Sequence, residues 1–551
     1  MGRVEAPAAN GTVRPPGVFC RSAPPRLPIA GWRGGLSAAL TAALALVAAA
    51  LLLLSGCASL PPVPTDRPLS RALADPQQTA LGRLVAGSAP RAGFSGFRLL
   101  LSGEDAFGSL AALADNAQRT LDLQYYLIRG DASSKALLTR VRSAADRGVR
   151  VRMLIDDLNT AGEDGLMLRL DEHANIEVRL YNPLPAGRGS TVTRVLASLT
   201  DMARINRRMH NKMMVADNAL AIMGGRNLGD AYFLQSEKSN FVDLDVIAAG
   251  PVVPVLSRSF DKFWNDPLAY PVGAIAARPA AEEDPRATQA APEELPAGAQ
   301  RSIATNALAA ELAARRLDLV WAPAAVIADA PSKISSEDDP AAEETLADDM
   351  NRLMRSATAE VIVISPYYVP GERGVALAED LQDKGVALRV LTNSLATTDA
   401  PVVHIGYSRY REPLLRAGAE LYELRPRIDA PPRSGLGSFG SSQASLHSKA
   451  LIIDRRTLLV GSMNMDPRSD KLNSEIGLVI RSRVLARQLQ RFFETVSQRS
   501  AWHVASAAEG SGLRWSSGGP EPEIRHSEPE ASPLLLLTLK LLAPFAPEQM
   551  L

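Results

Sequence analysis

The sequence is poor in cysteine and histidine. Its 551 residues include two cysteines, Cys20 and Cys57, and six histidines. Two cysteines exclude a Cys-rich zinc module and a disulfide scaffold as the basis of the fold. Charge of one sign is not in excess, because 60 basic residues balance 60 acidic ones. This balance argues against a generally basic nucleic-acid-binding protein but leaves room for a local basic pocket.

The first 56 residues have the features of a targeting segment. A Pro/Gly-rich, Arg-containing stretch precedes an apolar run from Leu36 to Leu54, which ends in Ser55-Gly56-Cys57. A basic flank, an apolar core and small residues before a cut site make up a secretory signal. The cysteine after Leu-Ser-Gly resembles the lipobox of bacterial lipoproteins. We therefore predict lipidation at Cys57 and a membrane-anchored lipoprotein of the bacterial cell envelope that faces the periplasm.

An uncleaved membrane anchor is the alternative for this segment. The apolar run has 19 residues, which is about enough to span a bilayer. The sequence leaves open whether the inner or the outer membrane holds the protein.

Helical and strand-like patterns alternate after residue 100. They predict a helix over 106–119, a strand over 121–127, a helix over 134–147 and a strand over 149–155. The rhythm returns with predicted strands at 361–365 and 387–392. This alternation is typical of a largely parallel sheet covered by helices. Because the length also favours two or more domains, we expect a duplicated α/β unit.

Composition divides the chain further. Residues 274–300 are rich in Ala, Pro and Glu, which suits a solvated linker. The apolar stretch Pro533–Phe545 is too short to span a bilayer and could be a core helix or an interfacial helix on lipid. The predicted segments are a signal peptide with lipobox (1–56), a stalk (57–95), a first domain (96–273), the linker (274–300), a second domain (301–505) and a C-terminal tail with an apolar segment (506–551).

One constellation of residues occurs twice. In each copy the lysine follows the histidine by two residues, the aspartate follows the histidine by seven, and the asparagine follows the aspartate by ten. Matched offsets of this kind are very hard to obtain by chance. The two copies consist of His210, Lys212, Asp217 and Asn227, and of His447, Lys449, Asp454 and Asn464.

The spacing suits phosphate chemistry. Residues i and i+2 of an extended segment point the same way, so each histidine shares a face with its lysine. Two copies that face each other would gather two cations and two amides around a phosphate diester. Two histidines suit a division of labour in phosphoryl transfer, in which one attacks phosphorus and the other protonates the leaving oxygen.

The repeated motif resembles the signature of the phospholipase D superfamily, H-x-K-x4-D-x6-G-S-x-N, and the resemblance runs from about Phe97 to the C-terminus. Within the superfamily the chain looks most like the C-type branch of bacterial cardiolipin synthases. The stretches that carry this likeness are 243–246, 392–395, 403–407 and 544–551. The resemblance implies two phospholipase D-like α/β/α sandwich domains, related by a pseudo-two-fold axis, with one active site at their interface.

The resemblance also implies a covalent mechanism without metal or other cofactor. His210 would be the nucleophile, His447 the acid and base, and Lys212, Lys449, Asn227 and Asn464 the ligands of the phosphate. Asp217 and Asp454 complete the catalytic motif, where we expect them to support its structure. Glu475, and Asp243 as its shorter counterpart, would each support a motif histidine. The first copy departs from the pattern with Gly225 in place of serine.

The predicted function is transfer of a phosphatidyl group between phospholipids in a membrane, which makes cardiolipin. The nearest alternative is a phospholipase D that releases phosphatidic acid, because the motif does not identify the acceptor. Another phosphodiesterase and a non-catalytic envelope protein are further alternatives. We expect no nucleic-acid partner. The sequence leaves open the donor lipid and the need for a small partner protein.

Overall fold

The computed structural model describes residues 60–62, 67, 69–184, 187–188, 202–236, 239–276, 297–335, 345–426, 443–507, 512–518 and 522–543. The predicted signal peptide and Cys57 lie outside these residues, as do residues 277–296 of the predicted linker and 544–551 of the tail. Within the described part of the chain, no helix is long and apolar enough to cross a membrane.

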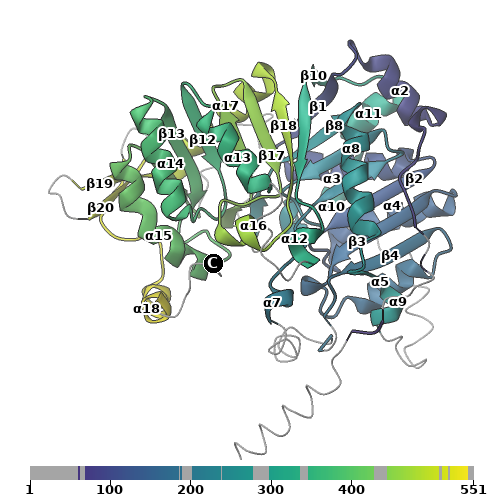
Figure 1. Cartoon of the computed structure of the whole chain (residues 1–551), viewed down its shortest axis with the longest axis horizontal. Coiled ribbons are helices and arrows are strands. Elements are labelled where there is room, and N and C mark those ends of the chain that lie inside the picture. Colours follow the sequence, from purple (N-terminus) through teal and green to yellow (C-terminus); the bar gives the residue numbers. More distant parts are fainter. Residues whose placement is uncertain are drawn as a thin grey trace, which may run out of the picture. The chain divides into compact units, whose positions relative to one another are not determined.

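The first half of the described chain alternates strands and helices (Figure 1). After η1 (Pro76–Gln78) and α2 (Ala80–Ser88), its elements are β1 (Ser95–Leu100), α3 (Gly103–Asn116), β2 (Thr120–Tyr125), α4 (Ala132–Asp146), β3 (Arg150–Asp156), η2 (Asp157–Asn159), α5 (Asp164–Asp171), β4 (Ile176–Tyr181), α7 (Met202–Ile205), β5 (Met213–Ala216), β6 (Leu220–Gly224), η3 (Asp230–Tyr232), β7 (Ser239–Val242), β8 (Asp245–Ala249), α8 (Val252–Trp264), β9 (Ala269–Pro271) and α9 (Val272–Ile275).

The second half repeats this succession. It follows α10 (Ala297–Ala304), α11 (Ala307–Ala313) and β10 (Val320–Ala322), which pack with the first half. Its own elements are β11 (Ala324–Ala328), α12 (Ser332–Ser335), α13 (Leu346–Arg355), β12 (Glu360–Ile364), α14 (Gly371–Asp383), β13 (Ala387–Asn393), α15 (Pro401–Arg416), β14 (Glu420–Leu424), β15 (Gln443–Leu446), β16 (Ala450–Ile453), β17 (Thr457–Gly461), α16 (Pro467–Lys471), β18 (Ile476–Arg481), α17 (Arg483–Arg499), β19 (Ala501–Ser506), β20 (Leu513–Ser517), β21 (Ile524–Arg525) and α18 (Pro533–Leu542).

Each half builds one large sheet, and the two strand orders correspond. The first sheet runs β10-β1-β8-β6-β5-β2-β3-β4-β9 and the second β11-β18-β17-β16-β12-β13-β14-β19-β20-β21. Thus β1 matches β11, and the series β8-β6-β5-β2-β3-β4 matches β18-β17-β16-β12-β13-β14. The predicted duplication of an α/β unit is confirmed.

The prediction of a largely parallel sheet is wrong. Only β2, β3 and β4 of the first sheet, and β12, β13 and β14 of the second, pair in parallel, and the other pairs in both sheets are antiparallel. The reason is the length of the connections. Helices α4 and α5 give room for parallel crossovers, whereas β5 and β6 are joined by a tight turn in which Asp217 and Asn218 have positive φ.

Residues 297–322 belong with the first half. Ala299, Leu308 and Leu312 are buried in the core beneath α3 and α4, and β10 pairs with β1 at the edge of the first sheet. The second sheet therefore begins with β11 at Ala324, beyond the expected start of the second domain at residue 301. Helices α10 and α11 cover apolar residues of the first half, which explains this placement.

Helices cover both faces of each sheet, as the predicted α/β/α sandwich requires. The outer faces carry separate cores, one under α3, α4 and α5 and one under α13, α14 and α15. The inner helices α8 and α17 share a single core, in which Phe260 and Leu489 lie with buried residues of both sheets such as Val215 and Ile452. This common core joins the two halves.

A short parallel pair also links the halves. Strand β7 of the first half pairs with β15 of the second, and Met209 forms a parallel bridge with Ser474. Each of these cross-links lies directly before a motif histidine, so the interface places both histidines.

Candidate active site

His210 and His447 lie just before β5 and β16, at the contact between the halves. The backbone N–H of His210 donates to the carbonyl of Ser474 at 3.0 Å, and that of His447 donates to Val242 at 2.8 Å. Each histidine is thus fixed by backbone of the opposite half. The pairing of each histidine with its lysine is set by the extended segment that leads into the strand.

A carboxylate from the opposite half holds each imidazole. The Nδ1 atom of His210 lies 3.0 Å from both carboxylate oxygens of Glu475, and Nδ1 of His447 lies 2.6 Å from Oδ2 of Asp243. Both carboxylates are fully buried. With Nδ1 occupied in each ring, Nε2 is the nitrogen that remains for a substrate.

The lysines of the motif are buried beside the histidines. Lys212 donates from Nζ to the carbonyl of His210 at 2.6 Å, and Lys449 makes the same contact with His447. Burial, only partly offset by Glu475, lowers the pKa of Lys212 to about 7. Burial also lowers the pKa of Lys449 to about 8. Both ammonium groups are therefore poorly solvated, and a bound anion would stabilise their charged form.

The histidines are held neutral. Burial lowers the pKa of His210 to about 4 although Glu475 acts to raise it, and burial together with Lys449 lowers the pKa of His447 well below its ordinary value. Lys449 also contributes to the lowering at His210, and Lys212 to that at His447, so the two copies act on one another electrostatically. A neutral imidazole has the free lone pair that a nucleophile or a base needs.

The asparagines of the motif are buried and incompletely hydrogen-bonded. Asn227 donates from Nδ2 to the Tyr232 hydroxyl at 3.0 Å. Within the described residues, the amide oxygens of Asn227 and Asn464 have no hydrogen-bond partner. Asn227 and Lys212 line the same small cavity. Each Nδ2 carries two N–H groups, so Asn227 keeps one donor for a phosphate oxygen besides its bond to Tyr232, and the free amide oxygens can accept from a hydroxyl.

Aromatic rings enclose the imidazoles. Tyr126 meets His210 edge to face with ring centroids 4.9 Å apart, and its ring lies 5.2 Å from Nζ of Lys212. Tyr232 and Phe241 lie 5.3 and 5.0 Å from the ring of His447. The sequence did not identify Tyr232 and Phe241, which belong to no repeated motif; only their position shortly after the first copy could have drawn attention to them.

The aspartates of the motif bind backbone at the far ends of β5 and β16. The carboxylate of Asp217 accepts N–H groups of Gln118, Arg119 and Thr120 at 2.7–3.2 Å. Asp454 does the same for residues 358–360. In this position each aspartate ties the end of a helix to the start of a strand, and the histidines lie at the other end of β5 or β16.

Gly225 and Asp243, which depart from the repeated pattern, lie against each other. A Cβ atom at position 225 would stand 2.1 Å from Oδ1 of Asp243, so no side chain fits there while Asp243 keeps its place. In the second copy Ser462 occupies the equivalent position and donates its hydroxyl to Glu475. The two departures therefore compensate each other.

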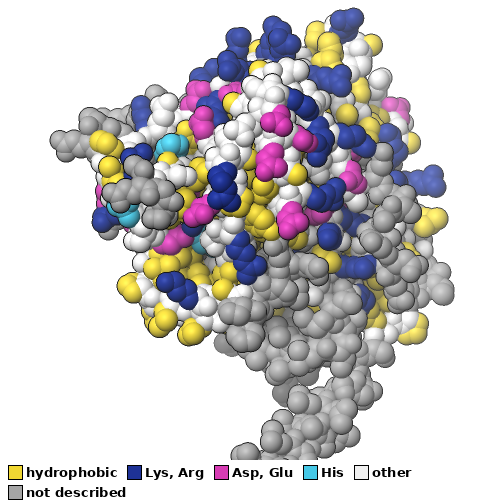
Figure 2. Space-filling model, turned by 60° about the vertical axis from the view of Figure 1, so that its left-hand side comes forward, with side chains coloured by type: hydrophobic (Ala, Val, Ile, Leu, Met, Phe, Trp, Pro, Cys, Tyr) yellow, Lys and Arg dark blue, Asp and Glu magenta, His cyan; other side chains and the backbone are white. Residues whose placement is uncertain are grey.

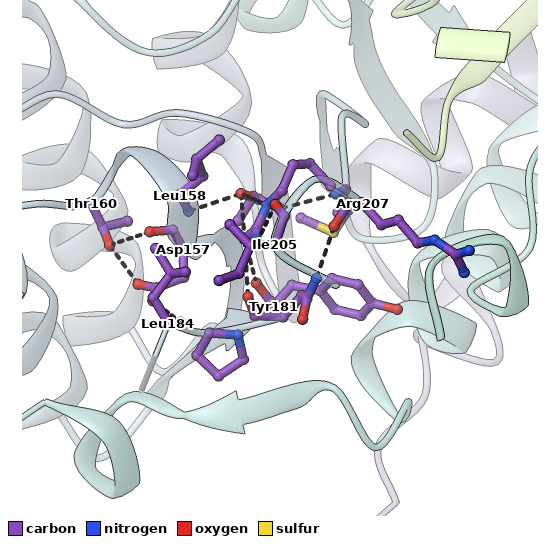
Figure 3. A network of polar contacts seen from close by, with 12 residues as sticks. Asp157, Leu158, Thr160, Tyr181, Leu184, Ile205 and Arg207 are labelled. Atoms are coloured by element: carbon purple, nitrogen blue, oxygen red, sulfur yellow. Dashed lines mark hydrogen bonds and ion pairs between the residues drawn. The ribbon is translucent and has the colours of Figure 1, made fainter. Parts of the chain in front are cut away.

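A polar side chain at the end of a central strand fixes the residue before each histidine. Asp156 at the end of β3 accepts the N–H of Met209 at 2.9 Å and forms a buried ion pair with Arg208. Figure 3 labels three neighbours of this ion pair, Leu158, Tyr181 and Ile205. The N–H of Leu158 donates to Asp156, and the carbonyls of Tyr181 and Ile205 accept from Arg208. At the end of β13, Asn393 bonds both the N–H and the carbonyl of Leu446 at 2.8 and 2.9 Å.

The described residues contain no group of three or more His, Cys, Asp or Glu side chains that could hold a metal ion. The groups at the interface are instead two imidazoles, two ammonium groups and two amides. The ammonium groups and amides can bind the oxygens of one phosphate, and the two imidazoles can transfer protons to and from it.

Comparison with known proteins agrees with this geometry. The family model described as "Cardiolipin synthase, PLD-like domain" matches residues 110–264 and 350–497, one segment in each half. The chain is 40% identical over 410 residues to cardiolipin synthase C of Escherichia coli (strain K12), which covers 73% of this chain and 84% of the relative. The chain belongs to the cardiolipin synthase family with phospholipase D-like domains.

Two more relatives refine this assignment. Cardiolipin synthase A of Pseudomonas entomophila (strain L48) is 25% identical over 401 residues, or 72% of this chain and 67% of the relative. The greater similarity to the C-type enzyme confirms the predicted branch. The crystal structure of phosphatidylserine synthase from Haemophilus influenzae Rd KW20 superposes with a TM-score of 0.53 at 14% identity, covers 86% of this chain and 100% of that chain, and supports the fold alone.

Proposed function

We propose that this protein is a phosphatidyltransferase that makes cardiolipin by moving a phosphatidyl group from one phospholipid to another. The observation that carries the proposal is the crossed arrangement of the site, in which each imidazole is bound through Nδ1 by a carboxylate of the opposite half and keeps Nε2 for substrate. Family membership and the similarity to a cardiolipin synthase C support the same reaction.

In the first step of the proposed reaction, Nε2 of His210 attacks the phosphorus of the donor phospholipid. The negative charge of the bound phosphodiester favours the protonated form of His447, which therefore takes up a proton from solvent at Nε2 before the step. The bond from phosphorus to the head-group oxygen then breaks, and His447 gives this proton to the departing oxygen. A phosphatidyl-histidine remains. Lys212, Lys449, Asn227 and Asn464 hold the non-bridging oxygens, where buried ammonium groups stabilise the negative charge that builds up in the transition state.

In the second step a hydroxyl of phosphatidylglycerol enters. His447, now neutral, takes its proton, the oxygen attacks phosphorus, and the P–N bond breaks. Cardiolipin leaves, and both imidazoles return to their starting protonation state. Glu475 and Asp243 keep each Nδ1 protonated and stabilise the imidazolium that forms transiently.

We also propose where the protein lies in the cell. We infer an enzyme of the bacterial cell envelope that is anchored through Cys57 and faces the periplasm, from the apolar run and the lipobox-like residues before that cysteine. Metabolic labelling of the wild-type chain with a fatty acid, compared with Cys57→Ser, tests the anchor.

Product analysis tests the reaction. The purified full-length chain is incubated with labelled phosphatidylglycerol, with and without phosphatidylethanolamine, and the lipids are separated. We expect labelled cardiolipin, and a higher yield with phosphatidylethanolamine would identify the second lipid as a donor. Phosphatidic acid as the sole product would overturn the synthase and leave a hydrolase with the same machinery. His447→Ala controls for a contaminating activity.

A further inference from the structure

Helix α18 presents a row of leucines to solvent. The side chains of Leu534, Leu537 and Leu541 are 73%, 55% and 65% exposed, and they recur at the i, i+3, i+7 spacing of one helix face. Eight large hydrophobic side chains are exposed in the described part of the chain, and four of them lie on α18. Figure 2 shows hydrophobic side chains gathered at the lower left, where α18 lies. We call Leu534, Leu537 and Leu541 the leucine face.

The opposite side of α18 is firmly attached to the second half. Leu535, Leu536 and Leu539 pack with Leu395 and Ile405 in a small separate core. The helix packs on α15, and Arg409 of α15 donates to the carbonyl of Ala543 at 3.1 Å. The leucine face is therefore exposed while the helix itself is anchored.

The segment before α18 is also pinned. Glu528 forms an ion pair with the buried Arg411 of α15, and Nε2 of His404 lies 3.0 Å from the same guanidinium. Arg411 also donates from Nε to Oε1 of Glu423 in β14 at 2.8 Å. This buried network ties the tail to the sheet, so the direction in which α18 points is set by the fold.

The attachment point of α18 adjoins the site. Leu395, on which α18 packs, follows two residues after Asn393, the side chain that holds Leu446 immediately before His447. The negative charge of Asp399, between Leu395 and α15, acts on the pKa of both His447 and Lys449. Exposed Val402 in the first turn of α15 adds another apolar side chain on this element.

We propose that α18 is an interfacial helix that inserts its leucine face into a phospholipid bilayer and so seats the second half of the site on the membrane. The inference rests on the proposed function for its choice of partner, because the substrates are then bilayer lipids. At about 1.5 Å per residue the ten-residue helix is far too short to cross a bilayer of about 30 Å, so it lies along the surface.

Charge agrees with a lipid surface. Helix α18 contains no acidic residue, and its one charged side chain, Lys540, is exposed between the attached side and the leucine face. A lysine in this position reaches the head groups of anionic lipids while the leucines enter the acyl region. A second copy of the chain could also cover apolar residues, and the test below separates that outcome.

Quenching by brominated lipids tests the insertion locally. Leu537→Trp is introduced into the full-length chain, and the protein is bound to vesicles of phosphatidylglycerol and phosphatidylethanolamine with brominated acyl chains. We expect the fluorescence that the added indole contributes to fall by more than half. In the control Val484→Trp, at an exposed position of α17, the added fluorescence should stay unquenched.

Three outcomes would overturn the proposal. The first is an unquenched indole at position 537, and the second is equal quenching in both variants. The third is a protein that is a dimer in solution and whose indole at position 537 is not quenched, because a second copy of the chain would then cover the leucine face. The fluorescence measurement needs no turnover. A quenched indole in a protein that makes no cardiolipin would therefore refute the proposed function but still support α18 as an interfacial helix.

Turnover gives a second, independent measurement. Leu537→Gln combined with Leu541→Gln should lower turnover of phosphatidylglycerol in vesicles at least fivefold. Turnover of a short-chain phosphatidylglycerol below its micelle concentration should be unchanged, because that substrate reaches the site from solution. Equal loss on both substrates would indicate damage to the fold and would contradict the proposal.

Discussion

His210 and His447 are held by carboxylates of the opposite half, but the two carboxylates are bound differently. Glu475 accepts hydroxyl groups from Ser462 and Ser469 in addition to the contact with His210. Although burial acts to raise it, His210, Lys212 and the hydroxyl of Ser462 hold the pKa of Glu475 below its ordinary value. Within the part of the chain that the structure describes, the carboxylate of Asp243 has only the backbone N–H of Leu244 as a partner besides His447, and burial raises its pKa.

The side chains that fix the residue before each histidine also differ in charge. A buried ion pair of Asp156 and Arg208 fixes Met209, whereas the neutral amide of Asn393 fixes Leu446. The backbone geometry of the two copies is alike, and the electrostatics around it are not. The duplicated fold thus preserves positions, while each copy can specialise in one of two chemical roles.

The largest effect is expected from the carboxylates. Glu475→Gln should lower kcat by about 10²–10³-fold, because an amide cannot accept all three donors that now converge on Glu475 and His210 loses its orientation. Asp243→Asn, which meets two donors, should lose less. Steady-state rates on phosphatidylglycerol in detergent measure both, and equal losses would contradict the asymmetry.

The lysines should separate the copies by pH. Lys212 has a pKa of about 7 and Lys449 of about 8, so both lose their proton as the pH rises from 6.5 to 9 and anion binding weakens. Titration with sulfate, whose charge is constant over this range, should show the dissociation constant rising about tenfold per lysine for each pH unit above its pKa. Lys212→Met should remove the earlier of the two rises, and an unaltered profile in that variant would refute the assignment.

Substitutions at Gly225 and Asp243 test whether these two departures of the first copy compensate each other. Gly225→Ser should lower activity about tenfold, because its Cβ would displace Asp243 from His447. Adding Asp243→Glu rebuilds the pair seen in the second copy and should recover most of the loss. A double-mutant cycle measures the coupling between the two positions. Additive effects would mean that the two departures arose independently.

The smallest effect on catalysis is expected from the aspartates of the motif. Asp217→Asn leaves three backbone N–H groups with a weaker acceptor and should cost about 1–3 kcal/mol in the free energy of unfolding. The kcat of the folded variant should stay within about twofold of wild type. Urea unfolding and initial rates provide the two values, and a large loss of kcat would show that Asp217 acts on the site.

The sequence predicted the parts of this molecule that repeat. Matched offsets identified both histidines and lysines, and the helices and strands that periodicity predicted lie within a few residues of their observed bounds. Helix α3, for example, begins at Gly103 because Ser102 caps it. Strand direction was missed, because a tight turn between β5 and β6 overrides the general alternation of helix and strand. The family resemblance suggested that Glu475 and Asp243 support the motif histidines, but it did not say which histidine each one meets. The contact of Glu475 with His210 joins residues 265 positions apart and depends on no local pattern.

We propose that one histidine of this pair carries the phosphatidyl group and that the other moves protons. The most direct test is mass spectrometry of His447→Ala after brief incubation with phosphatidylglycerol and quenching in base, which preserves a phosphorus–nitrogen bond. We expect a phosphatidyl adduct on His210 that builds up in this variant and is absent from His210→Ala. An adduct on His447 in the His210→Ala variant would reverse the roles, and no adduct in either variant would contradict covalent catalysis.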